Sequence, residues 1–204
     1  MDSHSPKLAA SLLTDSLQEH LKTVQALLDS TLEDIERSGQ MICDALAAGR
    51  KILLCGNGGS AADAQHIAAE LVGCYERQRR SWPAIALTTD TSALTAVSND
   101  LGYEQVFARQ IAGLAQAGDV LIAISTSGRS KNVLQAVERA REIGCRTIAL
   151  TGASSDPLGP MCDMTVAVPA SRTSRIQEAH ITIGHLWCEM VDQIEPQKDT
   201  GDRE

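Results

Sequence analysis

The first fifty residues carry the spacing of apolar positions that is typical of helices. Leucine, valine and isoleucine recur every three or four positions between charged residues, and neither proline nor glycine occurs from Lys7 to Ser38. This pattern predicts a helical segment over residues 1–50. So long a helix ahead of the first strand packs either against a second subunit, which we favour, or onto its own sheet. The apolar positions are Leu13, Leu17, Leu21, Val24, Leu28, Leu32 and Ile35.

After residue 50 the pattern changes to short apolar runs, most of them followed by residues rich in Gly, Ser or Thr. Continuous runs without alternation are typical of strands in a parallel sheet that helices cover on both faces. Because helical stretches separate the runs, the sequence predicts an α/β fold with a doubly wound five-stranded parallel sheet. The runs are residues 51–55, 84–87, 120–124, 147–150 and 164–168.

The predicted sheet brings the polar loops to one edge. The carboxyl ends of parallel strands lie together, and open α/β sheets bind ligands there. The chain has no repeat or internal linker. Residues 51–195 are therefore predicted to form one compact unit with the N-terminal helices, followed by a polar tail over residues 196–204.

Composition then narrows the classes of function. The 204 residues carry a formal net charge of −8 and are 43% hydrophobic but only 2% aromatic. This acidic balance argues against nucleic-acid binding, which needs a basic face. No apolar stretch approaches the ~18 residues of a membrane span, and residues 1–16 lack a secretory signal. The six scattered cysteines favour a reducing, cytoplasmic location over disulfides or a thiolate metal site.

The loop after the third predicted strand, Ser125–Ser130 (STSGRS), has the character of an anion site. Free backbone N–H groups at a helix N-terminus, together with hydroxyl groups, suit a phosphate. The loop does not end in Gly-Lys-Ser/Thr, which argues against a P-loop nucleotidase. An ordinary Ser/Thr-rich helix cap is the alternative. The sequence favours phosphate binding.

A second loop, Gly56–Ala61 (GNGGSA), fits a form of the dinucleotide-binding fingerprint. That fingerprint also needs an acidic residue about 20 positions further on, and Asp90 lies too far along the chain. We therefore favour a loop that brings backbone and polar groups close to a sugar.

Two predicted helices carry candidate metal ligands. His66 and Glu70 are four residues apart and share a helix face, whereas Gln177 and His185 lie on the last helix, for which Ser171 or Thr173 is the expected N-cap. Such N and O donors suit a divalent ion such as Zn²⁺, although a surface ion pair is the commoner reading of His66 and Glu70. Gln177 and His185 are about 12 Å apart along a regular helix. We therefore hypothesise a site at a subunit interface, with different chains supplying the two helices.

Four blocks of the sequence resemble the phosphoheptose isomerases, which are members of the sugar isomerase (SIS) fold. The resemblance extends from about residue 8 to residue 195. The blocks are Cys55–Leu71 (CGNGGSAADAQHIAAEL), Pro83–Ser92 (PAIALTTDTS), Ile124–Gly128 (ISTSG) and Arg175–His180 (RIQEAH).

This resemblance implies that the protein converts sedoheptulose 7-phosphate to D-glycero-D-manno-heptose 7-phosphate, towards the ADP-heptoses of bacterial surface polysaccharide. It implies a homotetramer with active sites at subunit interfaces and one zinc ion per subunit. Glu70 and His185 match the family's acid–base pair. The matched zinc ligands are His66, Glu70, Gln177 and His185. The matched substrate-binding positions are Asn57, Gly58, Gly59, Glu70, Asn99, Asp100, Ser125, Thr126, Ser127, Ser130 and Gln177.

A few positions depart from the pattern of the family. Cys74 stands where relatives often carry a basic residue, and Arg129 and Lys131 replace residues that are more often uncharged. Both cations would favour a phosphate dianion if they face the ligand, and facing solvent is the alternative. Two rival functions remain: a non-catalytic relative such as the initiator-associating protein that binds DnaA, and an isomerase of another sugar phosphate. Since Glu70 and His185 are both present, the enzyme is favoured.

Overall fold

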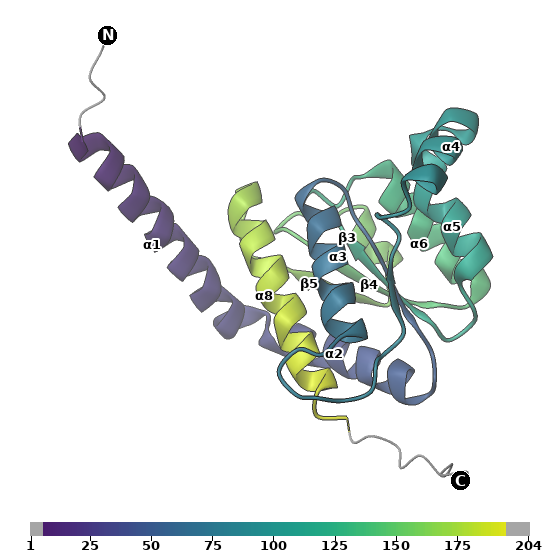
Figure 1. Cartoon of the computed structure of the whole chain (residues 1–204). Helices are drawn as coiled ribbons and strands as arrows, with labels where there is room; N and C mark the ends of the chain where they lie inside the picture. Colours follow the sequence, from purple (N-terminus) through teal and green to yellow (C-terminus); the bar gives the residue numbers. More distant parts are fainter. Residues whose placement is uncertain (1–5, 195–204) are drawn as a thin grey trace.

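The computed structural model describes residues 6–194, so the predicted polar tail at 196–204 lies outside the described residues. Helices and strands alternate along most of the chain (Figure 1). In chain order the elements are α1 (Pro6–Ser30), α2 (Leu32–Ala47), β1 (Ile52–Cys55), α3 (Gly59–Val72), β2 (Ala84–Ala86), α4 (Thr91–Leu101), the 3₁₀ turn η1 (Tyr103–Gln105), α5 (Val106–Leu114), β3 (Val120–Ile124), α6 (Lys131–Ile143), β4 (Arg146–Thr151), α7 (Leu158–Met161), β5 (Met164–Ala167) and α8 (Thr173–Val191).

The sheet has the predicted class. Five parallel strands run in the order β2-β1-β3-β4-β5, and each coincides with one of the predicted apolar runs. The chain leaves β1 towards β2 on one side and returns to β3 on the other. Since β1 and β3 are direct neighbours, the loops that follow them meet at the point where the winding direction changes, which is where this class of sheet binds ligands.

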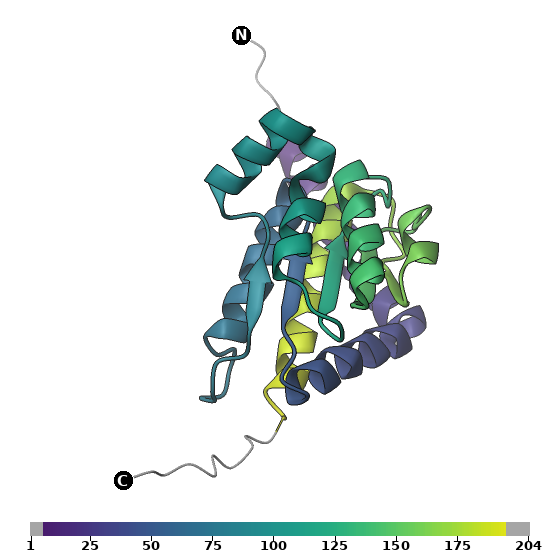
Figure 2. The ribbon, with the colours of Figure 1, turned by 90° about the vertical axis from the view of Figure 1, so that its right-hand side faces the viewer.

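Helices cover both faces of the sheet (Figure 2). Alternate strand residues point to opposite faces, so Ile52 and Leu54 join a core with α2, α3 and α8, whereas Leu53 packs with α5 and α6. Burial on both faces explains why these strands are apolar without alternation. The prediction of a doubly wound α/β fold is confirmed.

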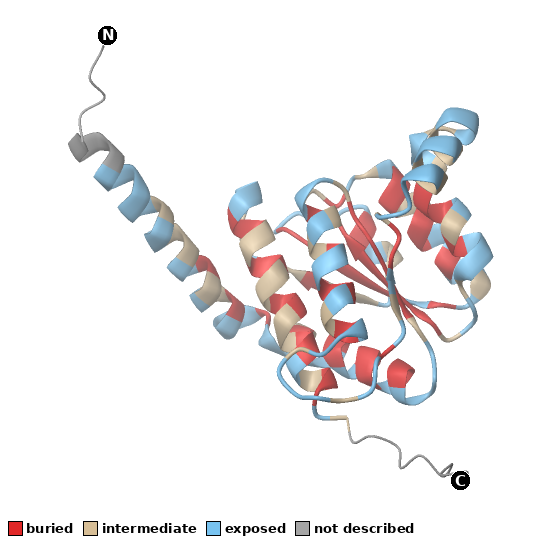
Figure 3. Ribbon diagram, viewed as in Figure 1, coloured by how far each residue is buried: buried red, intermediate tan, exposed pale blue. Residues whose placement is uncertain are grey.

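The N-terminal helical segment divides into two helices at Thr31. Helix α2 packs onto the sheet and against α8, whereas α1 extends away from the body of the molecule (Figures 1 and 3). Leu17 and Leu21 of α1 are each 66% exposed, and Ile35 of α2 is buried. Of the two N-terminal helices, only α2 therefore packs onto the chain's own sheet, which was the alternative to contact with a second subunit.

Two buried polar side chains, Asp119 and His180, join elements of the fold. At the amino end of β3, the buried carboxylate of Asp119 accepts hydrogen bonds from the backbone N–H groups of Lys51 and Gln116 and pairs with Lys51 Nζ at 2.6 Å. On α8, burial lowers the pKa of His180 to about 4, and its Nε2 lies 3.1 Å from the carbonyl oxygen of Thr151. His180 therefore stays neutral near pH 7 and links α8 to β4.

The last helix begins at Thr173, and its N-cap is Arg172, whose side chain makes no capping hydrogen bond. The expected cap by Ser171 or Thr173 was therefore wrong.

Within residues 6–194, none of the helices combines the length and the apolar character that crossing a bilayer requires.

Candidate functional site

The loops after β1 and β3 are tied together by a pair of asparagines. Asn57 Nδ2 donates to Asn132 Oδ1 at 2.9 Å, and Asn132 Nδ2 donates back to Asn57 Oδ1 at 2.8 Å. The hydroxyl of Tyr103 also donates to Asn57 Oδ1, at 2.9 Å. Asn132 is buried near the start of α6. This pair of amide hydrogen bonds between the buried Asn132 and the half-buried Asn57 holds the two loops in one arrangement.

The loop after β3 opens onto a polar cavity of about 480 Å³. Thr126 and Ser127 line it, as expected for the predicted anion site, whereas Ser125 and Ser130 are not among its lining residues and their hydroxyl oxygens lie 3.1 Å apart. The first turn of α8 lies at the rim, where free N–H groups favour an anion. The residues that line the cavity are Thr126, Ser127, Arg129, Ala153, Ser154, Ala170, Ser171, Thr173 and Ile176.

The two cations of this loop face different surroundings. Arg129 lines the cavity. The ammonium of Lys131 instead lies 3.1 Å from the carboxylate of Glu104 in an exposed ion pair. Only Arg129 is therefore placed to favour a phosphate in the cavity.

The predicted acid–base residues, Glu70 and His185, both contact His66 where α3 and α8 lie side by side (Figure 1). His66 Nε2 is 3.2 Å from Glu70 Oε1 and 3.4 Å from His185 Nε2. Gly184 allows this approach, because a Cβ there would lie 2.6 Å from Cδ1 of Ile67 on the facing helix. One chain thus supplies both helices to this cluster, and no second chain is needed to bring these three side chains together.

Two facing ring nitrogens need either one shared proton or a cation between them. The donor set of two imidazoles and a carboxylate is the kind that Zn²⁺ prefers. Among the side chains that the structure describes, however, no group of three or more His, Cys, Asp or Glu is arranged to hold a metal ion. The donor chemistry fits zinc, and the metal site stays a prediction.

Gln177 lies apart from this cluster. A side chain at Gly59 would collide with the amide of Gln177, so that amide covers the first residue of α3. His66 and Glu70 lie in the second and third turns of the same helix. The structure therefore places Gln177 beside the predicted sugar loop and not beside His185.

The remaining predicted substrate residues lie on exposed surfaces near this edge. Gly58 adopts a positive φ of 56° at the start of α3 with open space around it. Asn99 and Asp100 are exposed on α4, where Asn99 Nδ2 donates to Asp100 Oδ1 at 2.8 Å. Asn99 shares a shallow hollow with Tyr103, which in turn contacts Asn57.

Sequence reasoning missed three residues near the site. Tyr75 lies against His185, with ring centroids 5.2 Å apart, and Asn132 holds Asn57. Asp63 lies one turn before His66, and burial raises its pKa to about 6 although the charge of His66 opposes the shift. Only Asp63 carried a signal, as a carboxylate on an alanine-rich helix, whereas Tyr75 and Asn132 lie in no motif whose spacing marks them.

The chain matches the model of the SIS domain family over residues 15–152. It is 55% identical over 177 residues to a phosphoheptose isomerase of Nitratiruptor sp., covering 87% of this chain and 95% of the relative. It is 51% identical over 173 residues to that of Aliarcobacter butzleri, covering 85% and 92%. The solved phosphoheptose isomerase of Neisseria gonorrhoeae superposes with a TM-score of 0.87 at 42% identity, covering 91% of this chain and all of that one.

Proposed function

The chain belongs to the phosphoheptose isomerase family of SIS-domain proteins, and from that premise we propose that it interconverts sedoheptulose 7-phosphate and D-glycero-D-manno-heptose 7-phosphate. One observation carries the proposal: His66, Glu70 and His185 meet on two helices of which one, α8, begins at an anion-binding cavity. That arrangement separates a phosphate end from an acid–base end.

The spacing along α8 suits a long sugar phosphate. Ile176 lines the cavity, and His185 follows nine residues later, about 13 Å further along the helix. The substrate carries its phosphate on C7 and its reacting carbonyl at C2. Phosphate held by Thr126, Ser127 and Arg129 would therefore direct the carbonyl end towards His185 and Glu70.

The reaction moves one proton between adjacent carbons and needs no redox cofactor. A base takes a proton from C1 of the ketose, an enediol forms, and a proton returns at C2 while O2 gains and O1 loses one. Glu70 takes the C1 proton, because a carboxylate beside the substrate can act as a general base and Glu70 matches one member of the family's acid–base pair. His185 serves the oxygens or C2, since an imidazole both donates and accepts near neutrality.

We propose Zn²⁺ as the cofactor, one per subunit, with His66, Glu70 and His185 as ligands. Gln177, the fourth predicted ligand, lies against Gly59 at the start of α3. The supporting observation is that the two Nε2 atoms face each other at 3.4 Å with a carboxylate alongside. When bound, zinc would polarise the carbonyl and stabilise the oxyanion.

The direct test is to follow sedoheptulose 7-phosphate by NMR with the purified protein, before and after treatment with a chelator, and to measure bound zinc. We expect heptose 7-phosphate to form, and chelation to remove both zinc and at least 90% of the rate, roughly the effect of losing Lewis-acid catalysis. Full activity without metal would contradict the zinc proposal alone. Tight binding of the sugar phosphate without conversion at any metal loading would favour the non-catalytic alternative.

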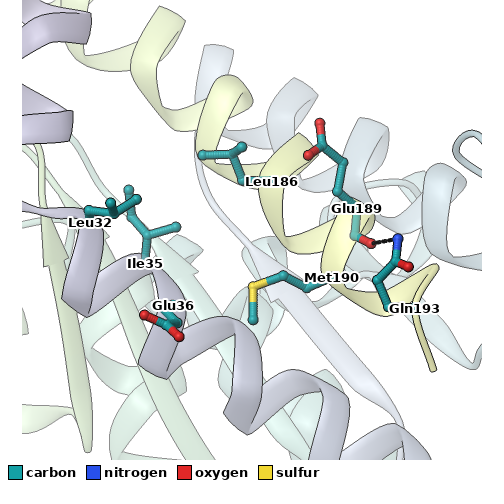
Figure 4. A pocket seen from close by; sticks show the side chains of 7 residues that line it. All are labelled: Leu32, Ile35, Glu36, Leu186, Glu189, Met190 and Gln193. Atoms are coloured by element: carbon teal, nitrogen blue, oxygen red, sulfur yellow. Dashed lines mark hydrogen bonds between the residues drawn. The ribbon is translucent and has the colours of Figure 1, made fainter.

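We further propose a homotetramer in which active sites lie at subunit interfaces. The supporting observation is a stripe of exposed leucines on α1, formed by Leu13, Leu17, Leu21 and Leu28, whereas Ser16 and Glu19 of the same helix contact α8. Helices α2 and α8 also border an apolar groove of about 390 Å³ (Figure 4). Leu186, which directly follows His185, lines this groove. A helix of a second copy lying there would therefore flank the acid–base cluster, the group formed by His66, Glu70 and His185. The groove residues are Leu32, Ile35, Glu36, Leu186, Glu189, Met190 and Gln193.

The double variant Leu17→Glu, Leu21→Glu should dissociate the assembly into smaller species in sedimentation velocity. Each leucine buried in an interface contributes about 1.5–3 kcal/mol, and a charge in its place opposes contact. The matched control is Gln18→Glu with Gln25→Glu, which adds the same charge to other exposed positions of α1. Equal dissociation by both pairs would contradict a specific role for the stripe.

We place the protein in the cytoplasm, consistent with six unpaired cysteines in the described chain.

A further inference from the structure

The segment between α3 and β2, residues 73–83, passes beside the acid–base cluster. We propose that it is a positioning element for that cluster, in which Arg79 and Asp192 hold the segment and Tyr75 holds the imidazole of His185. The inference rests on the proposed function for its effect on catalysis. Its geometric part, the placement of Tyr75 against His185, can be measured without any turnover.

Asp192 anchors the segment from the end of α8. Its Oδ2 accepts hydrogen bonds from the backbone N–H groups of Glu76 and Arg77, at 2.9 and 3.0 Å. Its Oδ1 accepts from Arg79 Nε at 2.7 Å, and the carboxylate is only 2% exposed. Burial by itself would raise the pKa of Asp192, but these three donors together lower it, so the anchor is charged near pH 7.

Arg79 extends the same anchor to α3. Its side chain is 5% exposed, and its guanidinium donates to the carbonyl oxygens of Glu70 and Leu71, at 2.9 and 3.0 Å. These carbonyls belong to the last turn of α3, whose partial negative charge a cation stabilises. The buried pair Arg79–Asp192 thus joins the ends of the two helices that carry Glu70 and His185, and it contacts Glu70 through its backbone.

Tyr75 lies on the part of this segment that faces His185. The rings of Tyr75 and His185 are tilted by 31° to each other, with centroids 5.2 Å apart. The His66 ring also contacts the His185 imidazole, edge-on, with centroids 5.0 Å apart. The imidazole of His185 therefore contacts both Tyr75 and His66, the residue that bonds Glu70, and these two contacts limit its rotation.

The chain contains a matched control for the anchor. Asp119 is also a buried carboxylate that accepts two backbone N–H groups and pairs with a cation, but it lies at the amino end of β3, at the opposite edge of the sheet from the ligand loops. Asp192→Asn and Asp119→Asn should both reduce stability in urea. Only Asp192→Asn should lower kcat, by about tenfold or more, with KM changed less than about twofold, because misplaced acid–base groups slow the chemical step.

Tyrosine variants test the ring itself. Tyr75→Leu should lower kcat like Asp192→Asn, and Tyr75→Phe should recover most of that loss because it keeps the ring. In NMR spectra the ring-current shift that Tyr75 adds to the His185 imidazole protons, beyond the shift from His66, should be present in the unsubstituted protein and in Tyr75→Phe, and lost in Tyr75→Leu and Asp192→Asn. The proposal is overturned if Tyr75→Leu keeps the original kcat, if Asp119→Asn lowers kcat as much as Asp192→Asn, or if the shift survives in Tyr75→Leu. An unsubstituted protein that is inactive overturns the proposed function, and the ring-current shifts then decide the placement of Tyr75 on their own.

Discussion

Glu70→Gln is expected to lower kcat about 10³-fold while the sugar phosphate still binds, because removing a positioned general base costs this order of rate. The amide keeps the size of the side chain and can still accept a hydrogen bond from His66, but it cannot take a proton from C1. The backbone carbonyl of Glu70 remains bonded to Arg79, so the end of α3 is unaffected. Turnover is measured by NMR and binding by calorimetry.

Glu142→Gln provides the control for this substitution. Glu142 lies on α6 in an exposed pair with Arg139, at the surface of the opposite helical layer. The same chemical change there should leave kcat unaltered. If Glu70→Gln retains more than about a tenth of the original kcat, Glu70 is not the base and the proposed proton transfer fails.

Gly128→Ala is expected to disrupt the loop after β3, which we propose binds the phosphate. Gly128 has a φ of 65°, and a Cβ there would lie 2.6 Å from the backbone oxygen of Ser155. Backbone atoms do not yield as a flexible side chain does, so the loop or the segment at 154–158 must move. We expect a loss of roughly 3 kcal/mol in unfolding free energy, from left-handed strain and overpacking together, and a rise of KM by at least about tenfold.

Gly49→Ala separates the two contributions. Gly49 also has a positive φ, of 73°, but nothing lies within 4 Å of its added Cβ, and it precedes β1 far from the ligand loops. It should therefore lose only about 1 kcal/mol, the conformational part, with KM unchanged. For both variants, urea unfolding measures the loss of unfolding free energy and steady-state kinetics measures the change in KM. A Gly128→Ala protein no worse than Gly49→Ala would show that the loop does not depend on its close contact with Ser155.

The strands and their loops could be predicted from local sequence because parallel strands covered on both faces must be apolar throughout. The run at residues 120–124 is such a strand, and the hydroxyl-rich loop after it necessarily lies at the carboxyl edge. The N-terminal segment was harder to assign. Leu17 and Ile35 occupy equivalent positions in one repeating pattern, yet one is exposed and the other buried, because the break at Thr31 turns α2 onto the sheet.

The acid–base cluster shows the same division. Spacing alone put His66 and Glu70 on one helix face, and the motifs pointed to His185, but the contact of His185 with His66 depends on α3 and α8 packing closely at Gly184. The separation of Gln177 from His185 was foreseeable, since eight residues along a straight helix are about 12 Å. That Gln177 instead covers Gly59 followed only from the packing of α8 beside α3.

The class of sheet and the position of the hydroxyl-rich loop at its carboxyl edge could be predicted from the chain alone, because they depend on local periodicity and on residue chemistry. The tertiary structure alone decided which groups meet: Asn57 with Asn132, Tyr75 with His185, and Asp192 with Arg79. The members of these pairs are 75, 110 and 113 residues apart in the sequence. Contacts over such separations are set by how helices pack on the sheet, and no periodic pattern along the chain records them.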